Sequence, residues 1–516
     1  MSRRLTRNAP FVLAALAGLL QAWSMAAPWN GQPLWWLQLL SLALLAGVLQ
    51  RQATPGRAAL AGWLFAVTWL AATFWWLFIS MHVYGGLATP LAVVAVLGLA
   101  AFLGLYYAAA CGAVRWLAQA TALRDSVLFA ALWLVAELMR VTWFTGFPWG
   151  EGGYAHVDGP LALLAPWIGV HGISAVAAGL AWLLSLLVLR EARGSWRYWI
   201  AIAAAAGLLA ACNAATRAAP AETGAPPLRI ALLQGNIPQD EKFESGSGIP
   251  LALGWYGESL AKVPASLVVA PETAVPLLPQ QLPAGYLDAL RKSFSAGGRA
   301  ALVGIPLGSF EQGYTNSVIA MKPGDSSYRY DKHHLVPFGE FIPPLFKWFT
   351  RMMNIPLGDF NRGDVGQPSF DWQGERLAPN ICYEDLFGEE LGARFRDEAR
   401  APTIFVNLSN SGWFGNTVAI DQHLQISRMR ALEFARPMIR ATNTGATAII
   451  DREGRVTHAL PRYTRGVLLG EVQGGRTITP YAWWVARLGL WPLWALSLVV
   501  ACLAWALRRR EAAPYN

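Results

Sequence analysis

Residues 88–114 read ATPLAVVAVLGLAAFLGLYYAAACGAV, and this stretch contains no charged side chain. A helix that crosses the hydrocarbon core of a bilayer needs about 20 apolar residues, so the run is long enough to span a membrane. Only 14% of the 516 residues are charged and 54% are hydrophobic, whereas a soluble protein carries about 25% charged residues. The sequence therefore predicts an integral membrane protein.

Similar apolar runs lie on both sides of this stretch. We expect eight transmembrane helices, over residues 10–27, 33–49, 58–80, 88–114, 125–139, 161–189, 198–216 and 488–507. Residues between 217 and 482 have the mixed composition of a soluble domain. The predicted organisation is seven helices in residues 1–216, one soluble domain in 217–482, and an eighth helix with a short tail in 483–516.

The arginines indicate how the helices are oriented. One side of the predicted bundle receives Arg3, Arg4, Arg7, Arg51, Arg57, Arg115, Arg124, Arg190, Arg193, Arg197, Arg508, Arg509 and Arg510. The short loops on the other side receive only Arg140. Because cytoplasmic loops are enriched in Lys and Arg, both termini are predicted to be cytoplasmic and the soluble domain to lie outside the cytoplasm. Much of the net charge of +9 is then a topology signal, and we expect no nucleic-acid partner.

The first apolar run has an alternative interpretation as a cleavable signal peptide. Arg3–Arg7 resembles a basic n-region, and Ser24–Ala27 resembles a cleavage site. We expect the run to be retained as a helix, because the alternation of charge between the loops requires it.

The soluble segment reads as strands that alternate with helices. Short apolar runs predict strands over residues 229–234, 266–270, 301–305, 316–320, 377–382 and 403–407. Residues 421–438 predict a helix, with Asp421 as its N-cap. This pattern is typical of a layered α/β domain with a largely buried sheet.

Three of the predicted strands are closely followed by ionisable side chains that can do chemistry. Glu272 comes just after the second strand, Lys332 follows the fourth, and Cys382 is the only cysteine of the soluble segment. Taken singly, each has a simpler interpretation: a solvated carboxylate, a surface charge and an inert buried thiol.

Together, these residues carry a resemblance. Pro271-Glu272-Thr273, KHHLVPFGE at 332–340 and ICYED at 381–385 resemble, in order and approximate spacing, three motifs of the nitrilase (carbon–nitrogen hydrolase) superfamily. That resemblance implies a Glu–Lys–Cys triad on a four-layer α-β-β-α sandwich. Within the superfamily, the apolipoprotein N-acyltransferases are similar in also carrying membrane helices around a periplasmic catalytic domain. TGFPW at 145–149, QGNIPQ at 234–239 and RMRALEFARP at 428–437 look like that family as well.

The sequence departs from the family pattern at two positions. Phe243 stands where we expect Trp, which keeps an aromatic ring but removes an indole N–H donor. Ser411 follows Asn410 where the family often has Asp. Both positions affect how the substrate is held rather than the triad.

The resemblance implies a role for each residue of the site. Cys382 would be the nucleophile that carries the acyl group, Glu272 the general base, and Lys332 the cation beside the oxyanion. The backbone N–H of Tyr383 would be a second oxyanion donor. Glu340 and Glu384 would orient Lys332 or the attacking amine.

The apolar residues 341–353 directly follow the lysine motif. We expect either a segment packed on the core or an arm at the membrane surface that gates the lipid, with Phe346 and Trp348 in contact with the bilayer. Phe243 and Trp413 are further candidates for contacts with the substrate.

The resemblance implies a phospholipid acyl donor and, as acceptor, the α-amine of diacylglyceryl-cysteine in an apolipoprotein, at a bacterial inner membrane. We expect no metal site, because the soluble segment lacks the recurrent His/Cys spacing of metal ligands. We also expect a monomer that uses no cofactor. Alternatives are a membrane-tethered amidase or nitrilase acting on a soluble amide, and a non-enzymatic transporter or sensor. A cysteine-protease-like site would instead pair Cys382 with His333, His334 or His423.

Overall fold

The computed structural model describes residues 2–188, 207, 210–212, 214, 226–295, 297–309, 311–324, 327–342 and 360–512. The chain forms two compact units. The helical unit comprises residues 1–75, 90–220 and 490–516, and the sandwich unit comprises residues 76–89 and 221–489. Residues 76–89 thus belong to the sandwich unit although they lie between two apolar runs of the sequence.

The helical unit contains α1 (Ser2–Met25), α2 (Trp35–Gln50), α3 (Pro55–Thr73), α5 (Thr89–Leu117), α6 (Ala122–Thr142), α7 (Ala165–Val188) and α15 (Trp491–Ala512). Within the described residues, five helices are long and apolar enough to cross a membrane, or six if one bent pair is a single span. Helix α2 is apolar but shorter than these. The predicted span over 198–216 lies largely outside the described residues.

The prediction of one continuous helix over residues 58–80 is wrong. Helix α3 ends at Thr73, and after a break of three residues α4 (Leu77–Ile79) begins and continues into a π-helical turn (Ser80–Tyr84). The physical reason lies in the sandwich unit, where Trp76 is buried. Its indole Nε1 donates to Gln422 Oε1 at 3.0 Å, and its ring lies 4.4 Å from that of Phe414. These contacts outweigh the tendency of an apolar run to continue as one helix.

The helical unit buries a group of polar side chains, here called the buried polar cluster: Glu137, Arg140, Glu151 and His171. Glu137 Oε1 accepts hydrogen bonds from Trp133 Nε1 at 3.1 Å and from the Ser174 hydroxyl at 3.0 Å. His171 Nδ1 lies 3.1 Å from Glu151 Oε2. Arg140 donates to the carbonyl oxygen of Pro148 at 3.2 Å. Two carboxylates are thus buried with one guanidinium and one imidazole.

The sandwich unit contains two six-stranded sheets. The first has the order β12 (Gly466–Val472), β1 (Leu228–Gln234), β2 (Leu267–Ala270), β3 (Ala300–Ser309), β4 (Gly313–Met321) and β5 (Arg329–Asp331). The second has the order β11 (Val456–Ala459), β10 (Ala448–Ile450), β9 (Met438–Thr442), β8 (Ile404–Ser409), β7 (Glu375–Ile381) and β6 (Phe370–Trp372). All six predicted strands are confirmed, as β1, β2, β3, β4, β7 and β8.

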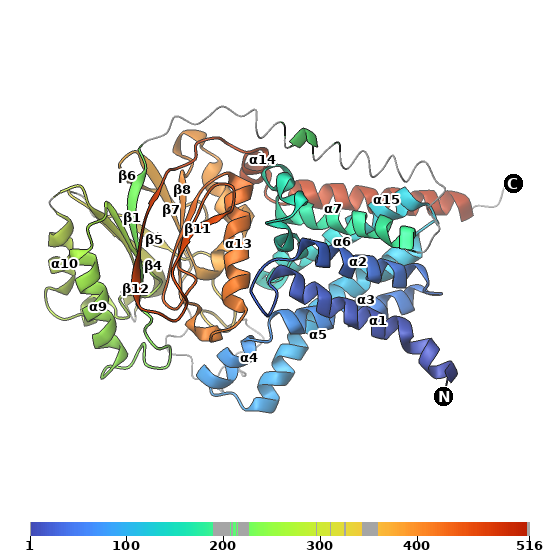
Figure 1. The fold of residues 1–516 in the computed structure, drawn as a ribbon, viewed down its shortest axis with the longest axis horizontal. Coiled ribbons are helices and arrows are strands. Elements are labelled where there is room, and N and C mark those ends of the chain that lie inside the picture. The colour runs from blue at the N-terminus through green and yellow to red at the C-terminus, as the bar shows by residue number, and fades with distance from the viewer. Residues whose placement is uncertain are drawn as a thin grey trace. The chain divides into compact units, whose positions relative to one another are not determined.

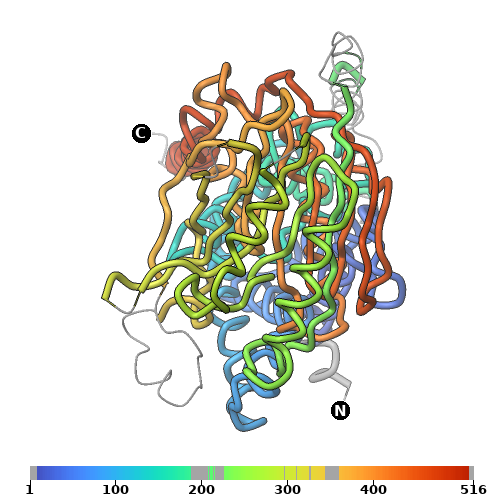
Figure 2. The backbone as a smooth tube through the Cα atoms, turned by 90° about the vertical axis from the view of Figure 1, so that its left-hand side faces the viewer, coloured from blue at the N-terminus to red at the C-terminus, as the bar shows by residue number. Residues whose placement is uncertain are grey.

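Helices cover the outer faces of both sheets (Figure 1). Helices α9 (Gly248–Lys262) and α10 (Tyr286–Phe294) pack on the first sheet, and Figure 2 is turned so that they face the viewer. Helices α13 (Ala419–Phe434) and α14 (Pro480–Leu488) pack on the second sheet. A third apolar core, with Leu232, Val269 and Val406 among its members, lies between the sheets. The unit is the predicted α-β-β-α sandwich.

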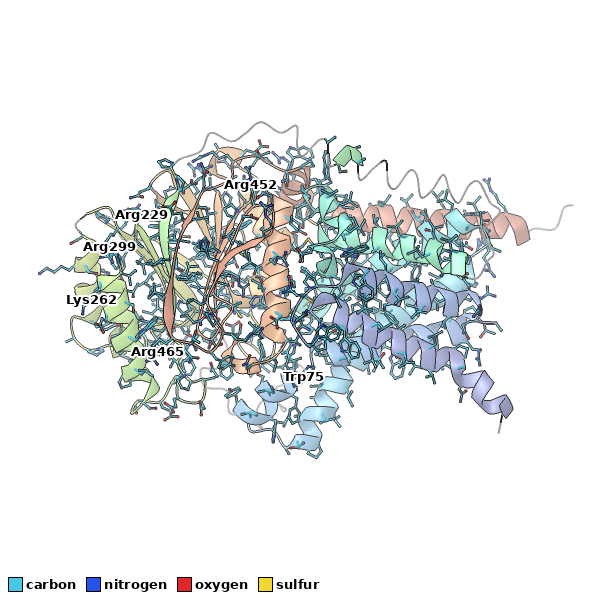
Figure 3. The ribbon with its side chains drawn as sticks, in the orientation of Figure 1. Trp75, Arg229, Lys262, Arg299, Arg452 and Arg465 are labelled. Carbon is cyan, nitrogen blue, oxygen red and sulfur yellow. The ribbon has the colours of Figure 1, made fainter. Side chains whose placement is uncertain are left out.

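Two details of the helical layers bear on the predictions. Helix α13 begins at Ala419, so Asp421 is not its N-cap; it lies in the first turn, where it pairs with Arg462 at 2.6 Å. Arg299, beside the start of β3, donates to the carbonyl oxygens of Leu260, Ala261 and Val263 (Figure 3). These bonds satisfy carbonyl groups at the end of α9 and tie that helix to the first sheet.

Candidate active site

The structure brings the three predicted site residues together from two different sheets. Glu272 lies in the turn after β2, Lys332 directly follows β5, and Cys382 directly follows β7. Lys332 Nζ is 3.5 Å from Glu272 Oε1. Glu384 binds the backbone N–H groups of His333 and Ile381, the neighbours of Lys332 and Cys382 in the sequence. Glu272 raises the pKa of the Cys382 thiol and Lys332 lowers it. Strands β2 and β7 each run parallel to a neighbouring strand. Glu272 and Cys382 follow the carboxyl ends of these strands, which is where ligands commonly bind in α/β sheets.

The Glu272 carboxylate is held by donors on both oxygens. Oε1 accepts from Asn316 Nδ2 at 2.7 Å, and Oε2 accepts from the backbone N–H of Asn410 at 3.0 Å. The turn beneath it has no spare room, because a Cβ on Gly304 would lie 2.8 Å from Glu272 Cα. Thr273 adopts a φ of 47°, in the left-handed region. The carboxylate is therefore fixed in position before any substrate arrives.

Lys332 is fully buried against a second carboxylate. Its Nζ lies 2.8 Å from each oxygen of Glu340. Glu340 also accepts from Asn316 Nδ2 at 2.9 Å and from the backbone N–H of Val336 at 2.8 Å. Burial alone would lower the pKa of Lys332, but Glu340 and then Glu272 raise it above its usual value. The ammonium is therefore a permanent positive charge in the site.

Cys382 adopts a φ of 52°, a conformation that non-glycine residues rarely take, at the junction of β7 with a 3₁₀ turn (Cys382–Leu386). Its carbonyl oxygen accepts from Asn407 Nδ2 at 3.1 Å and lies 3.2 Å from His423 Nε2. The residue keeps partial exposure. Burial of the thiol and then the charge of Glu272 raise its pKa to about 12, against the opposing effect of Lys332. At neutral pH the thiol is therefore protonated and needs a base to react.

Glu384 joins the lysine and cysteine segments. Its Oε1 accepts from the backbone N–H groups of His333 at 2.7 Å and His334 at 3.2 Å. Its Oε2 accepts from the backbone N–H of Ile381 at 2.6 Å and from the Tyr330 hydroxyl at 2.7 Å. The side chain thus holds the backbone on both sides of the site. Burial raises its pKa in spite of these donors.

The three histidines of the rival interpretation make contacts other than with the thiol. His333 Nδ1 lies 2.7 Å from the Gly363 carbonyl oxygen, and His334 Nδ1 lies 2.8 Å from Glu390 Oε1. His423 Nε2 lies 3.0 Å from Asp385 Oδ1, in addition to its contact with the Cys382 carbonyl. Each of these three imidazoles thus has a carbonyl or carboxylate oxygen as a described contact.

The remaining predicted residues differ in burial, and two of them lie outside the described residues. Tyr383 is buried, with its ring 5.2 Å from that of Phe387. Trp413 and Phe243 are partly exposed, and the ring of Trp413 lies edge-on to Tyr84 at 5.7 Å. Phe346 and Trp348 lie outside the described residues, so their predicted contact with a lipid stays a prediction.

Sequence reasoning missed three residues of the site. Asn316 bridges Glu272 and Glu340 through one amide group, and Asn410 binds Glu272 through its backbone. Lys242 is buried, with its Nζ 3.2 Å from the carbonyl oxygen of Glu272. A polar residue at the start of an otherwise apolar predicted strand was a usable signal for Asn316. Lys242 directly precedes the noted Phe243, but nothing in the sequence indicates that it is buried.

The arrangement can support nucleophilic acyl transfer. A thiol, a fixed carboxylate that can take its proton, and a permanent cation for a developing oxyanion are the three groups that this chemistry needs. The polar groups that hold them in place come from β4, the lysine segment and the turn after β8.

Two family models match the two parts of the chain. Residues 17–183 match the family described as Apolipoprotein N-acyltransferase N-terminal domain, and residues 229–479 match Carbon-nitrogen hydrolase. Among solved structures, a variant of the amidase from Nesterenkonia sp. AN1 is similar with 17% identity and a TM-score of 0.37, over 52% of this chain and 96% of that one.

Curated relatives match over nearly the whole chain. The Apolipoprotein N-acyltransferase of Verminephrobacter eiseniae is 61% identical, over 92% of this chain and 92% of that protein. The relative of the same name in Ralstonia nicotianae is 45% identical, over 97% of this chain and 94% of that protein. These matches confirm the resemblance and the nitrilase-like fold class predicted from the sequence. The chain belongs to the apolipoprotein N-acyltransferase family.

Proposed function

We propose that this enzyme moves an acyl chain from a phospholipid to the N-terminal α-amine of diacylglyceryl-cysteine in apolipoproteins, through a thioester on Cys382. Family membership supports acyl transfer over the alternative, hydrolysis of a soluble amide. The observation that carries the mechanism is the contact set of Glu272, Lys332 and Glu340 beside a thiol whose pKa is about 12.

In the first step, Glu272 takes the proton of the Cys382 thiol while the sulfur attacks the ester carbonyl carbon. The carbonyl oxygen becomes an oxyanion next to the ammonium of Lys332, with the backbone N–H of Tyr383 as second donor. The C–O bond then breaks, and the departing alcohol oxygen takes the proton from Glu272. A thioester and a lysophospholipid result.

In the second step, the amine of the acceptor attacks the thioester carbonyl and Glu272 takes a proton from the nitrogen. Lys332 again stabilises the oxyanion. The C–S bond breaks, and the proton on Glu272 returns to the sulfur. The products are an amide and the resting enzyme, and Glu340 keeps Lys332 in place throughout.

Mass spectrometry of Cys382 tests this function directly. Incubation with phospholipid vesicles alone should leave a long-lived acyl group on the peptide that contains Cys382. A diacylglyceryl peptide with a free N-terminal amine should discharge it to an N-acylated product, whereas the same peptide with a blocked amine should not. Rapid decay to free fatty acid, regardless of the amine, would identify a hydrolase.

We also propose that both termini are cytoplasmic and that the sandwich unit is periplasmic, at the inner membrane. The distribution of arginine between the loops supports this orientation. A reporter fused after Arg217 should be active only outside the cytoplasm, and fusions at Arg57 and Asn516 should report the cytoplasm. A cytoplasmic signal from the Arg217 fusion would contradict the orientation.

A further inference from the structure

The site contains a second buried ammonium, on Lys242. This residue lies in the segment between β1 and α9 and is 2% exposed. Gly248, at the start of α9, packs against its backbone so closely that a Cβ there would lie 2.9 Å from Lys242 Cα. The side chain runs to the site, where Nζ donates to the carbonyl oxygen of Glu272 at 3.2 Å. The lysine is therefore held at both ends.

The hydrogen bond from Lys242 holds the backbone carbonyl group of Glu272. Asn316, Asn410 and Lys332 all contact the carboxylate. Lys242 instead fixes the peptide that leads into the left-handed Thr273. A general base must keep its oxygen within hydrogen-bond reach of the proton that it removes, so the position of this peptide matters for the rate.

Lys242 also adds a positive charge to the site. Glu272 and Glu340 contribute two carboxylates beside the ammonium of Lys332. A thiolate on Cys382 would add a further negative charge, which the ammonium of Lys242 would favour. Burial lowers the pKa of Lys242 to about 8, while its two facing charged groups, Glu272 and Cys382, oppose that change. Lys242 therefore titrates close to neutral pH, unlike Lys332.

We propose that Lys242 is a positioning residue of the acyl-transfer site, whose ammonium fixes the peptide of Glu272 and favours the formation of negative charge on Cys382. This inference rests on the proposed function for its effect on acylation, but not for its effect on the thiol. The competing explanation is a purely structural lysine that satisfies one buried carbonyl group.

The test uses the full-length enzyme and two variants, Lys242→Arg and Lys242→Met. Acylation of Cys382 is followed by mass spectrometry in a single turnover, with vesicles of phosphatidylethanolamine and phosphatidylglycerol, between about pH 6 and 10. Lys262→Met is the matched control, because Lys262 is exposed and pairs only with Glu258 on the same helix (Figure 3).

We expect Lys242→Met to acylate about tenfold to a hundredfold more slowly, with no inflection near pH 8. The wild type should lose part of its rate as pH rises through about 8, where Lys242 loses its proton. Lys242→Arg stays charged and should show that loss only at higher pH. Lys262→Met should behave like the wild type. Equal profile shapes for Lys242→Met and the wild type would overturn the proposal, even if the variant is slower or less stable.

A second measurement needs no acyl donor. The rate at which iodoacetamide alkylates Cys382 reports how much thiolate is present. At pH 7, Lys242→Met should be alkylated about tenfold more slowly than the wild type, because one positive charge near the sulfur is lost. Unchanged alkylation would overturn the electrostatic part of the proposal. If the wild type forms no acyl-enzyme at all, the proposed function fails while this measurement still decides the role of Lys242.

Discussion

The two units of this molecule both bury charged groups, but they do so differently. In the helical unit, Glu137, Arg140, Glu151 and His171 are at most 1% exposed and come from α6, α7 and the loop between them. In the sandwich unit, Glu272, Lys332 and Glu340 meet from separate segments, and Glu340 and the nearby residue Cys382 keep partial exposure. Both units thus bury charged groups, and among these residues only Glu340 and Cys382 are partly exposed.

This difference shows what separates a structural polar cluster from a reactive site. The buried polar cluster balances two carboxylates against an arginine and a histidine and contains no nucleophile. At the candidate active site, backbone and amide donors hold each oxygen of Glu272 and Glu340, and both charges act on the thiol of Cys382. We therefore expect changes in the first group to affect stability and changes in the second to affect the rate.

The largest effect should come from the nucleophile. Cys382→Ala should abolish the covalent acyl adduct, and Cys382→Ser should be nearly inactive because a hydroxyl is a much weaker nucleophile than a thiol at neutral pH. Mass spectrometry of the adduct measures both. The melting temperature should stay close to that of the wild type, because the residue is only partly buried. An adduct on another residue in Cys382→Ala would show that the reactive site is misassigned.

Glu272→Gln and Lys332→Met should both slow acylation, by about 10²- to 10⁴-fold for the base and about 10²- to 10³-fold for the cation. They should shift the thiol pKa in opposite directions. Glu272 raises the pKa of Cys382 and Lys332 lowers it. The thiol of Glu272→Gln should therefore be alkylated by iodoacetamide at lower pH than the wild type, and that of Lys332→Met only at higher pH. Shifts of the same sign in both variants would contradict the charge assignment.

A change in the helical unit should have the opposite profile. Glu151→Gln changes the fully buried group that lies 3.1 Å from His171 Nδ1, and an imperfectly satisfied buried polar contact costs about 1 to 3 kcal/mol. The melting temperature in detergent should fall by several degrees, while the acylation rate per folded molecule stays within about twofold of the wild type. Loss of acylation in a folded Glu151→Gln protein would contradict the expectation that changes in the helical unit affect stability rather than the rate.

The smallest effect should come from the histidines. His423→Ala removes one contact to the Cys382 carbonyl and the contact to buried Asp385, whereas Asn407 still holds the carbonyl oxygen at 3.1 Å. A single hydrogen bond of this kind contributes about 1 kcal/mol, which is about fivefold in rate. Loss of the Asp385 contact should lower stability rather than the rate per folded molecule. His333→Ala and His334→Ala should be milder still. An inactive His423→Ala beside an active Glu272→Gln would favour the cysteine–histidine site.

The sequence predicted six buried strands that read as apolar runs. It missed β9 and β10 although both are buried along their whole length, because β9 contains Arg440 and β10 has only three residues. Strands β5 and β6 have three residues each, and every residue of β11 is exposed, so none of them leaves that signal. The break after Thr73 was also beyond reach. It depends on a hydrogen bond between Trp76 and Gln422, which are 346 residues apart.

The sequence also predicted the site residues that lie in motifs, but not those that only the packing of the fold brings to the site. Glu272, Lys332 and Cys382 lie in recognisable motifs, and the structure places them together. Asn316 bridges two carboxylates only because β4 lies beside β5, and that pairing is a property of the assembled sheet. The burial of Lys242 likewise depends on how the segment before α9 folds back on the turn after β2.

Glu384 has a consequence for how this enzyme acquires its reactivity. Its two oxygens bind the backbone of His333, His334 and Ile381, segments about fifty residues apart that carry the cation and the nucleophile. Glu384 can make all of these contacts only when both segments are in place. We therefore expect the two segments to order together, and a chain in which either one is displaced lacks the Glu272 and Lys332 charges that shift the pKa of the Cys382 thiol. Under the proposed function, only the fully folded enzyme would then present this thiol, with its base and its cation, to the phospholipid esters of the membrane.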